Sequence, residues 1–117
     1  MNELERFYSA IGSNANPVIE RFGGNAEITK RFIKKFAAEE SYENLKKALA
    51  SNEAEEAFRA AHTLKGICLN LGFAQLTEDV VNITEILRSG KLEGTDKLFS
   101  KIQTTYENTV ATIKKMD

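Results

Sequence analysis

The stretch AAHTLKGICLNLG, residues 60–72, is the part of the sequence from which the fold and the function can best be predicted. It contains the only histidine of the chain, His62, with Lys65 three residues and Gly66 four residues further on. Residues three and four apart are neighbours on one face of a helix, so these three residues form one surface spot. Gly72 follows where the helical pattern stops, which is typical of a helix C-cap.

The apolar residues of this helix predict which side faces the core. At about 100° per residue they gather well over a right angle away from His62, which places His62 outside the core stripe and near solvent. Phe58, Arg59 and Leu69 lie on the side of His62. Large apolar side chains beside an exposed histidine indicate a docking patch, but Phe58 and Leu69 are equally well interpreted as boundary core residues under the N-terminal helices. The core stripe consists of Ala54, Ala57, Ala61, Leu64, Cys68 and Leu71.

The three residues of the surface spot favour phosphoryl chemistry. An imidazole nitrogen is a good nucleophile, and covalent histidine intermediates are established chemistry. A cation one helical turn away, Lys65, favours the negative charge of a phosphorylated ring. Gly66 inside a helix costs about 1 kcal/mol relative to alanine. The gain we expect from it is clearance for a partner that approaches His62.

The run from His62 to Gly66, followed by Asn70-Leu71-Gly72, resembles the signature of the histidine-containing phosphotransfer (HPt) domain family. By this resemblance His62 is the phospho-accepting residue, Lys65 stabilises the phosphoryl charge, and Gly66 gives access to the ring. The similarity extends to Phe22-Gly23-Gly24, Phe36, Leu76 and Tyr106.

The chain also departs from the family pattern. In several members a glutamine or glutamate on the following helix orients the histidine ring, and here that place holds Thr84, with Glu85 next to it. Thr84 is therefore the candidate for the ring-orienting role. Arg88 matches a basic position that many members keep, and is a candidate auxiliary residue. The small residues usual after the lysine-glycine pair are replaced at positions 67–69.

Composition restricts the class of protein. The chain has 117 residues, 42% hydrophobic and 28% charged, with a net charge of −1 and one cysteine. We expect a single HPt-like domain over residues 1–117. The charge balance argues against a nucleic-acid partner, and no apolar run is long enough for a membrane span. One cysteine gives no internal disulfide, so we expect a cytoplasmic protein, and we expect it to be a monomer.

Helical periodicity predicts an all-α protein, an antiparallel four-helix bundle with short N-terminal helical segments that cover one end. We expect a short helix over residues 2–11, a helix start at Asn16-Pro17, and a helix capped by Asn25. Whether this third helix continues through Glu39-Glu40-Ser41 to Leu45 and Leu49, or bends there, is left open. Asn52 and Glu55 resemble a capping box that opens the His62 helix.

Other site classes have little support in the sequence. One histidine and one cysteine do not make a structural zinc site, and no acid or serine is placed to complete a hydrolase triad. No glycine loop for phosphates is present. We therefore expect no metal and no cofactor, and a carrier rather than an enzyme.

Our functional prediction is a phosphorelay carrier in two-component signalling. His62 accepts a phosphoryl group from a receiver-domain aspartate and passes it to another receiver, the partners being receiver domains of a hybrid histidine kinase or a response regulator. Phe58, Arg59 and Leu69 are the predicted docking residues. Three alternatives stay open: the N-terminal phosphotransfer domain of a chemotaxis-type histidine kinase, a docking-only bundle without transfer, and a phosphatase that uses His62 covalently.

Overall fold

Helices account for all the regular secondary structure in residues 1–116, which are the residues that the computed structural model describes. No strand occurs in this part of the chain, as the prediction of an all-α protein requires. The helices are α1 (Glu3–Ala10), α2 (Ala15–Arg21), α3 (Ala26–Phe36), α4 (Ser41–Ala50), α5 (Ala54–Leu71), α6 (Ala74–Arg88) and α7 (Thr95–Lys114).

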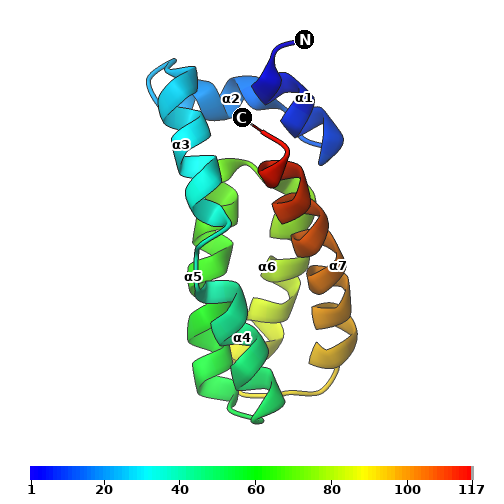
Figure 1. Cartoon of the computed structure of the whole chain (residues 1–117). Coiled ribbons are helices and arrows are strands. Elements are labelled where there is room, and N and C mark those ends of the chain that lie inside the picture. Colours follow the sequence, from blue (N-terminus) through cyan, green and yellow to red (C-terminus); the bar gives the residue numbers. More distant parts are fainter. Residues whose placement is uncertain (117) are drawn as a thin grey trace.

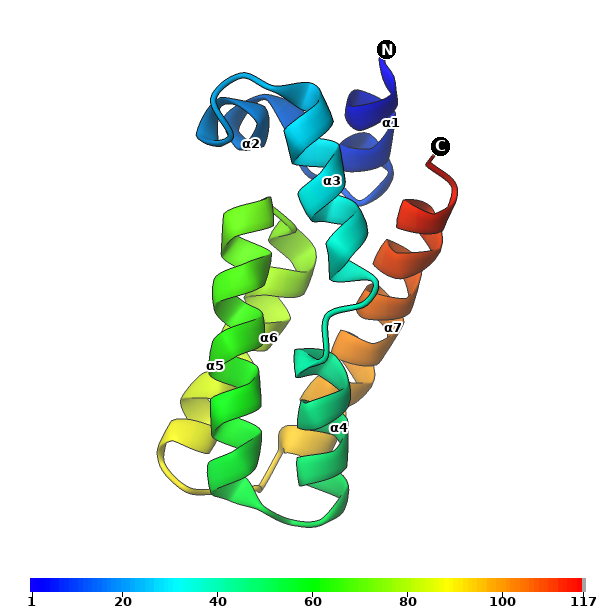
Figure 2. The same ribbon diagram turned by 60° about the vertical axis from the view of Figure 1, so that its left-hand side comes forward.

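Helices α4, α5, α6 and α7 run antiparallel to their neighbours in chain order and form an elongated bundle (Figure 1). The molecule measures 43 × 23 × 21 Å, with the long axis along these helices. Helix α3 lies end to end above α4, so the two form one arm of the bundle in two pieces (Figure 2). The predicted four-helix bundle is confirmed, with its first arm bent between Phe36 and Ser41.

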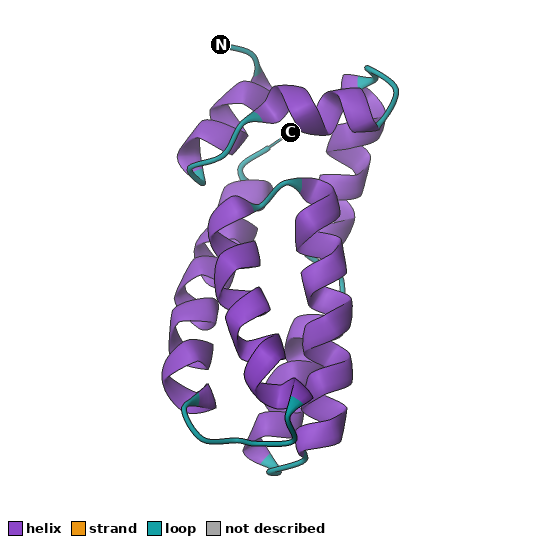
Figure 3. Ribbon diagram, turned by 180° about the vertical axis from the view of Figure 1, so that it is seen from behind, coloured by secondary structure: helices purple, strands orange, loops and turns teal. Residues whose placement is uncertain are grey.

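Helices α1 and α2 lie across the end of the bundle where the α5–α6 turn and the last residues of α7 meet (Figure 3). Two side chains from these helices satisfy carbonyl groups at the C-terminal end of α5. The Tyr8 hydroxyl donates to the Leu71 carbonyl at 2.6 Å, and the Arg21 guanidinium donates to the Leu69 carbonyl at 3.0 Å and to that of Asn70. The last carbonyls of a helix have no partner within it, so α1 and α2 close this end of α5.

Buried side chains from every helix join in one hydrophobic core that extends from Leu4 to Ile113. The aromatic ring of Phe73, at the α5–α6 turn, packs edge-on against Phe7 of α1 and Phe36 of α3, with centroids 5.8 and 5.0 Å apart. The N-terminal helices therefore share the core of the bundle.

Two predicted helix caps are present. The Asn25 side chain accepts a hydrogen bond from the Ile28 amide at 3.0 Å and so caps α3. Gly72 ends α5 in the left-handed conformation, with φ of 70°, and the next amide, that of Phe73, bonds to the Cys68 carbonyl at 3.0 Å. Glycine adopts this conformation without the strain that a Cβ would bring.

Two other predicted starts are wrong. Helix α2 begins at Ala15 with Asn14 as its cap, so Pro17 is its third residue; proline is tolerated there because first-turn amides lack helical partners. The Asn52–Glu55 capping box does not form. Asn52 adopts a left-handed conformation, with φ of 55°, which closes α4 and leaves Glu53 as the N-cap of α5.

Candidate functional site

His62 lies on the exposed side of α5, in the middle of the helix. On the opposite side, Ala57, Ala61, Leu64 and Cys68 are each 1% exposed or less, which confirms the predicted core stripe. The regular 3.6-residue repeat thus separates a core side from the side that carries His62. The imidazole is open to a partner from solvent.

The ring of His62 lies against that of Phe58, one turn earlier in α5. The two ring centroids are 5.8 Å apart and the planes differ by 26°, a stacked arrangement. Phe58 itself is half-buried and packs against the core. The guanidinium carbon of Arg88, from α6, lies 5.1 Å from the centre of the Phe58 ring.

Arg88 is held by a carboxylate of its own helix. Its Nε and Nη2 atoms both lie 3.3 Å from the Glu85 carboxylate, and both side chains are more than half exposed. An exposed pair of this kind contributes little to stability. Its consequence is geometric, because it keeps the guanidinium beside Phe58.

Lys65 lies one turn after His62 and is half-buried. Within residues 1–116 no carboxylate forms an ion pair with its ammonium group. The ammonium group is available to an anion that arrives at His62, and its charge favours negative charge there.

Gly66 has no structural reason to be glycine. A Cβ built on its backbone would meet no heavy atom within 4 Å, and its φ is not in the left-handed region. The helix would accept alanine here and gain by it. The absence of a side chain leaves open space beside His62 on the solvent side.

The family comparison agrees with this geometry. A family model described as "Hpt domain" matches residues 35–112, which include α4, α5 and α6 whole and most of α7. This chain belongs to the HPt domain family. HPt domains carry phosphoryl groups on histidine in two-component signalling, where they interact with receiver domains of kinases and response regulators. The comparisons with curated proteins and with solved structures gave no match.

Thr84 of this HPt domain lies on the helix after that of His62, as predicted, but its side chain is in the core. It is fully buried, and its hydroxyl donates to the Val80 carbonyl at 2.6 Å, one turn back in α6. This back-bond fixes the only proton of the hydroxyl inside the helix. The placement gives no support to the ring-orienting role, and we do not propose it further.

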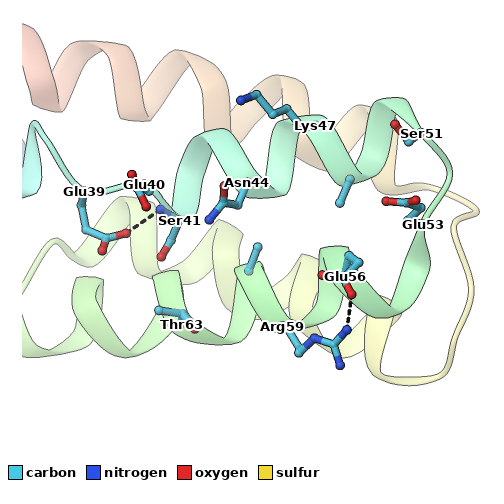
Figure 4. Close-up of a pocket in the computed structure, with 12 residues that line it drawn as sticks. Glu39, Glu40, Ser41, Asn44, Lys47, Ser51, Glu53, Glu56, Arg59 and Thr63 are labelled. Atoms are coloured by element: carbon cyan, nitrogen blue, oxygen red, sulfur yellow. Dashed lines mark hydrogen bonds and ion pairs between the residues drawn. The ribbon is translucent and has the colours of Figure 1, made fainter.

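The remaining predicted docking residues differ in their surroundings. Leu69 is 53% exposed, so it is not a boundary core residue. The Arg59 guanidinium donates to the Glu55 carboxylate at 3.1 Å and to that of Glu56, and the hydrogen bond to Glu56 raises the pKa of the guanidinium. Figure 4 shows Arg59 and Glu56 at the edge of a polar groove between α4 and α5, which is also lined by Asn44 and Thr63.

Residues 1–116 contain no metal-ligand cluster, no reactive thiol and no membrane-spanning helix. No group of three or more histidine, cysteine or acidic side chains is placed to hold a metal ion there. Burial raises the pKa of the Cys68 thiol to about 12, so this thiol is an inert core group. None of the helices in the described residues is long and apolar enough to cross a membrane.

The sequence did not indicate the contact between Arg88 and Phe58. It joins residues 30 positions apart in the sequence, and it depends on the antiparallel packing of α5 on α6. The only local signal was the position of Arg88 at the end of the helix that follows the His62 helix.

Proposed function

We propose that this HPt domain is a phosphorelay carrier that accepts a phosphoryl group on His62 from a receiver-domain aspartate and passes it to a second receiver. The observation that carries the proposal is the exposure of the chain's only histidine, beside a half-buried lysine and an unobstructed glycine on one helix face. The family match, which spans His62, adds to it.

The transfer is a displacement at phosphorus. An unprotonated ring nitrogen of His62 attacks the phosphorus in line with the aspartyl oxygen; the N–P bond forms, the P–O bond breaks, and the aspartate leaves as a free carboxylate. Positioning and electrostatics account for most of the catalysis in such a step. Lys65 stabilises the charge of the phosphoryl group on the ring. The reverse path loads the second receiver.

In this proposal the receiver approaches along the exposed side of α5. Leu69 offers the receiver an apolar contact, and Phe58 borders the His62 ring. Arg59 offers a cation on the N-terminal side of His62. Clearance at Gly66 lets the backbone of the receiver's active site come close to His62. The receiver brings the phosphoryl group and its own catalytic groups, so this domain is a substrate-like module and no enzyme by itself.

We also propose that residues 1–117 fold as a single HPt domain, with the 34 residues before the family match included. The shared core from Leu4 to Ile113 supports this, as do the Tyr8 and Arg21 bonds to the end of α5. We further propose that the phosphoryl transfer takes place in the cytoplasm, in keeping with the single, buried thiol of Cys68.

The experiment is phosphoryl transfer from a panel of phosphorylated receiver domains, followed by intact mass spectrometry without acid. His62→Gln is the control, since an exposed side chain can be replaced without loss of the fold. We expect one phosphoryl group on the wild type and none on His62→Gln. Receivers that bind but do not transfer would indicate a docking-only bundle. Turnover of a small phosphate ester without a receiver would indicate a phosphatase.

A further inference from the structure

The stacked rings of Phe58 and His62 suggest how this domain orients its histidine. In several family members a glutamine or glutamate on the following helix orients the ring, a place taken here by the buried Thr84. Within residues 1–116 the aromatic ring that contacts His62 is that of Phe58, with centroids 5.8 Å apart and planes that differ by 26°. The contact available to orient the ring in this chain is therefore aromatic.

An exposed histidine on a helix would otherwise rotate about two side-chain torsions among several wells. In-line attack on phosphorus needs one ring orientation, and a reacting atom that is misplaced by about 1 Å can lower a rate by about a hundredfold. Aromatic pairs are favoured at centroid distances of about 4.5–7 Å. The observed pair falls in this range, so the stack restricts the ring.

Phe58 needs support to restrict its neighbour, and it has support from two sides. Its half-buried side chain packs on the core. From α6, the Arg88 guanidinium lies 5.1 Å from its ring centre, a cation–π distance, and Glu85 holds that guanidinium at 3.3 Å. The orientation of His62 is thereby tied to the packing of α5 on α6.

We propose that Phe58 is the positioning residue of His62, acting through ring stacking, and that Arg88 acts through Phe58. The inference rests on the phosphocarrier function proposed above. It gives Phe58 a role beyond docking, and it gives Arg88 a role that needs no contact with the phosphoryl group.

The test compares Phe58→Leu with Phe58→Tyr. Leucine keeps an apolar side chain but removes the ring, whereas tyrosine keeps the ring. Transfer is followed at increasing concentrations of a phosphorylated receiver that loads the wild type. We expect the maximal rate of Phe58→Leu to fall about tenfold, with little change in the receiver concentration for half-maximal rate, and we expect Phe58→Tyr to restore the rate.

A second readout is independent of the receiver. The proton resonances of the His62 ring shift in Phe58→Leu, because the ring current of the phenyl group is lost, and return in Phe58→Tyr. A raised half-maximal concentration with an unchanged maximal rate would make Phe58 a docking residue only and overturn the proposal. A wild type that no receiver loads would instead refute the phosphocarrier function itself.

Arg88→Gln tests the second part of the proposal. If Arg88 acts through Phe58, the single variant Arg88→Gln has a lower maximal rate than the wild type. Adding Arg88→Gln to Phe58→Leu then lowers the rate no further, since the effects of coupled residues are not additive. If the two losses multiply, Arg88 acts on the phosphoryl group directly, and its assignment as a support for Phe58 is wrong.

Discussion

Gly66 and Gly72 lie six residues apart, one in the middle of α5 and one at its end, and their surroundings are opposite. A Cβ at Gly72 would overlap the Val18 methyl of α2, and its φ of 70° is left-handed. A Cβ at Gly66 would meet open space in an ordinary helical turn. The fold therefore requires glycine at the end of the helix. In the middle of the helix, glycine is tolerated at a cost in stability, which leaves function as the reason for Gly66.

The same contrast extends to the neighbouring side chains. At the end of α5, Tyr8 and Arg21 bond to carbonyl groups and so attach α1 and α2 to this end of the helix. On the solvent side of α5, His62 is exposed, and Leu69, the next apolar side chain along that side, keeps 53% of its surface in solvent. An exposed apolar residue beside a nucleophile contributes little to folding and is available to a partner.

The largest effect on stability is expected at the end of the helix. Gly72→Ala should lower the free energy of unfolding by about 2–4 kcal/mol, the sum of left-handed strain and overpacking against Val18. Denaturant unfolding measures it. Gly90→Ala is the matched control, since Gly90 has φ of 81° with nothing within 4 Å of a Cβ. An equal loss in both variants would show that the overlap with Val18 contributes nothing.

Gly66→Ala should have the opposite effect on stability. Alanine is the better helix former, so the free energy of unfolding should rise by about 1 kcal/mol, while the rate of phosphoryl transfer falls because the methyl group obstructs the receiver. Thr63→Ala, at an exposed position of the same helix, controls for propensity alone. A more stable variant that transfers at the wild-type rate would remove the functional reason for Gly66.

Tyr8→Phe removes the hydrogen bond to the Leu71 carbonyl and leaves the ring in place. We expect a loss of about 1 kcal/mol in the free energy of unfolding, since a buried acceptor loses its partner. The transfer rate should not change, because the end of α5 does not take part in the chemistry. A slower transfer in this variant would show that the end of α5 affects the chemistry at His62, and would contradict the contrast between these two parts of the helix.

Tyr8 also gives a prediction for alkaline pH. Burial raises the pKa of its phenol well above the ordinary value of 10.0. Above pH 10 the unfolded chain loses this proton while the folded chain keeps it, so the unfolded state binds fewer protons and stability falls as pH rises. Unfolding measured between pH 9 and 11 should show a shallower fall in Tyr8→Phe. Burial also raises the pKa of Tyr42, to about 12, so part of the fall remains.

The smallest effect on stability is expected at Arg59. Its partners Glu55 and Glu56 are exposed residues of its own helix, and such pairs contribute little to stability. Arg59→Ala should leave unfolding nearly unchanged but raise the receiver concentration needed for half-maximal transfer. Arg31→Ala, an exposed arginine on α3, is the control for net charge. Equal effects of the two variants would exclude Arg59 from the docking surface.

The sequence predicted the parts of the molecule that depend on local repeats. The core stripe of α5, the exposure of His62, the Asn25 cap and the Gly72 end follow from spacing within one helix. It could not predict the partners of Tyr8 and Arg21, which bond to carbonyl groups 63 and 48 residues away. Neither a helix pattern nor a cap signal contains such contacts.

The capping box that does not form and the lack of support for the role of Thr84 have the same origin. Asn52 fits a capping box by spacing, but the chain uses it to close α4, and one residue cannot serve both ends. Thr84 occupies the sequence place of a ring-orienting residue, but it is too short to leave the core, and its hydroxyl bonds to the Val80 carbonyl. A count along the chain gives the position of a side chain and does not give its reach.

The most direct test of the central claim is to locate the phosphoryl group. After transfer from a phosphorylated receiver, the protein is digested at alkaline pH, where a phosphorus–nitrogen bond to histidine survives, and its peptides are fragmented in the mass spectrometer. We predict one phosphoryl group, on His62, which is lost on mild acid treatment and absent from His62→Gln. A phosphoryl group on any other residue, or full labelling of His62→Gln, would contradict the account.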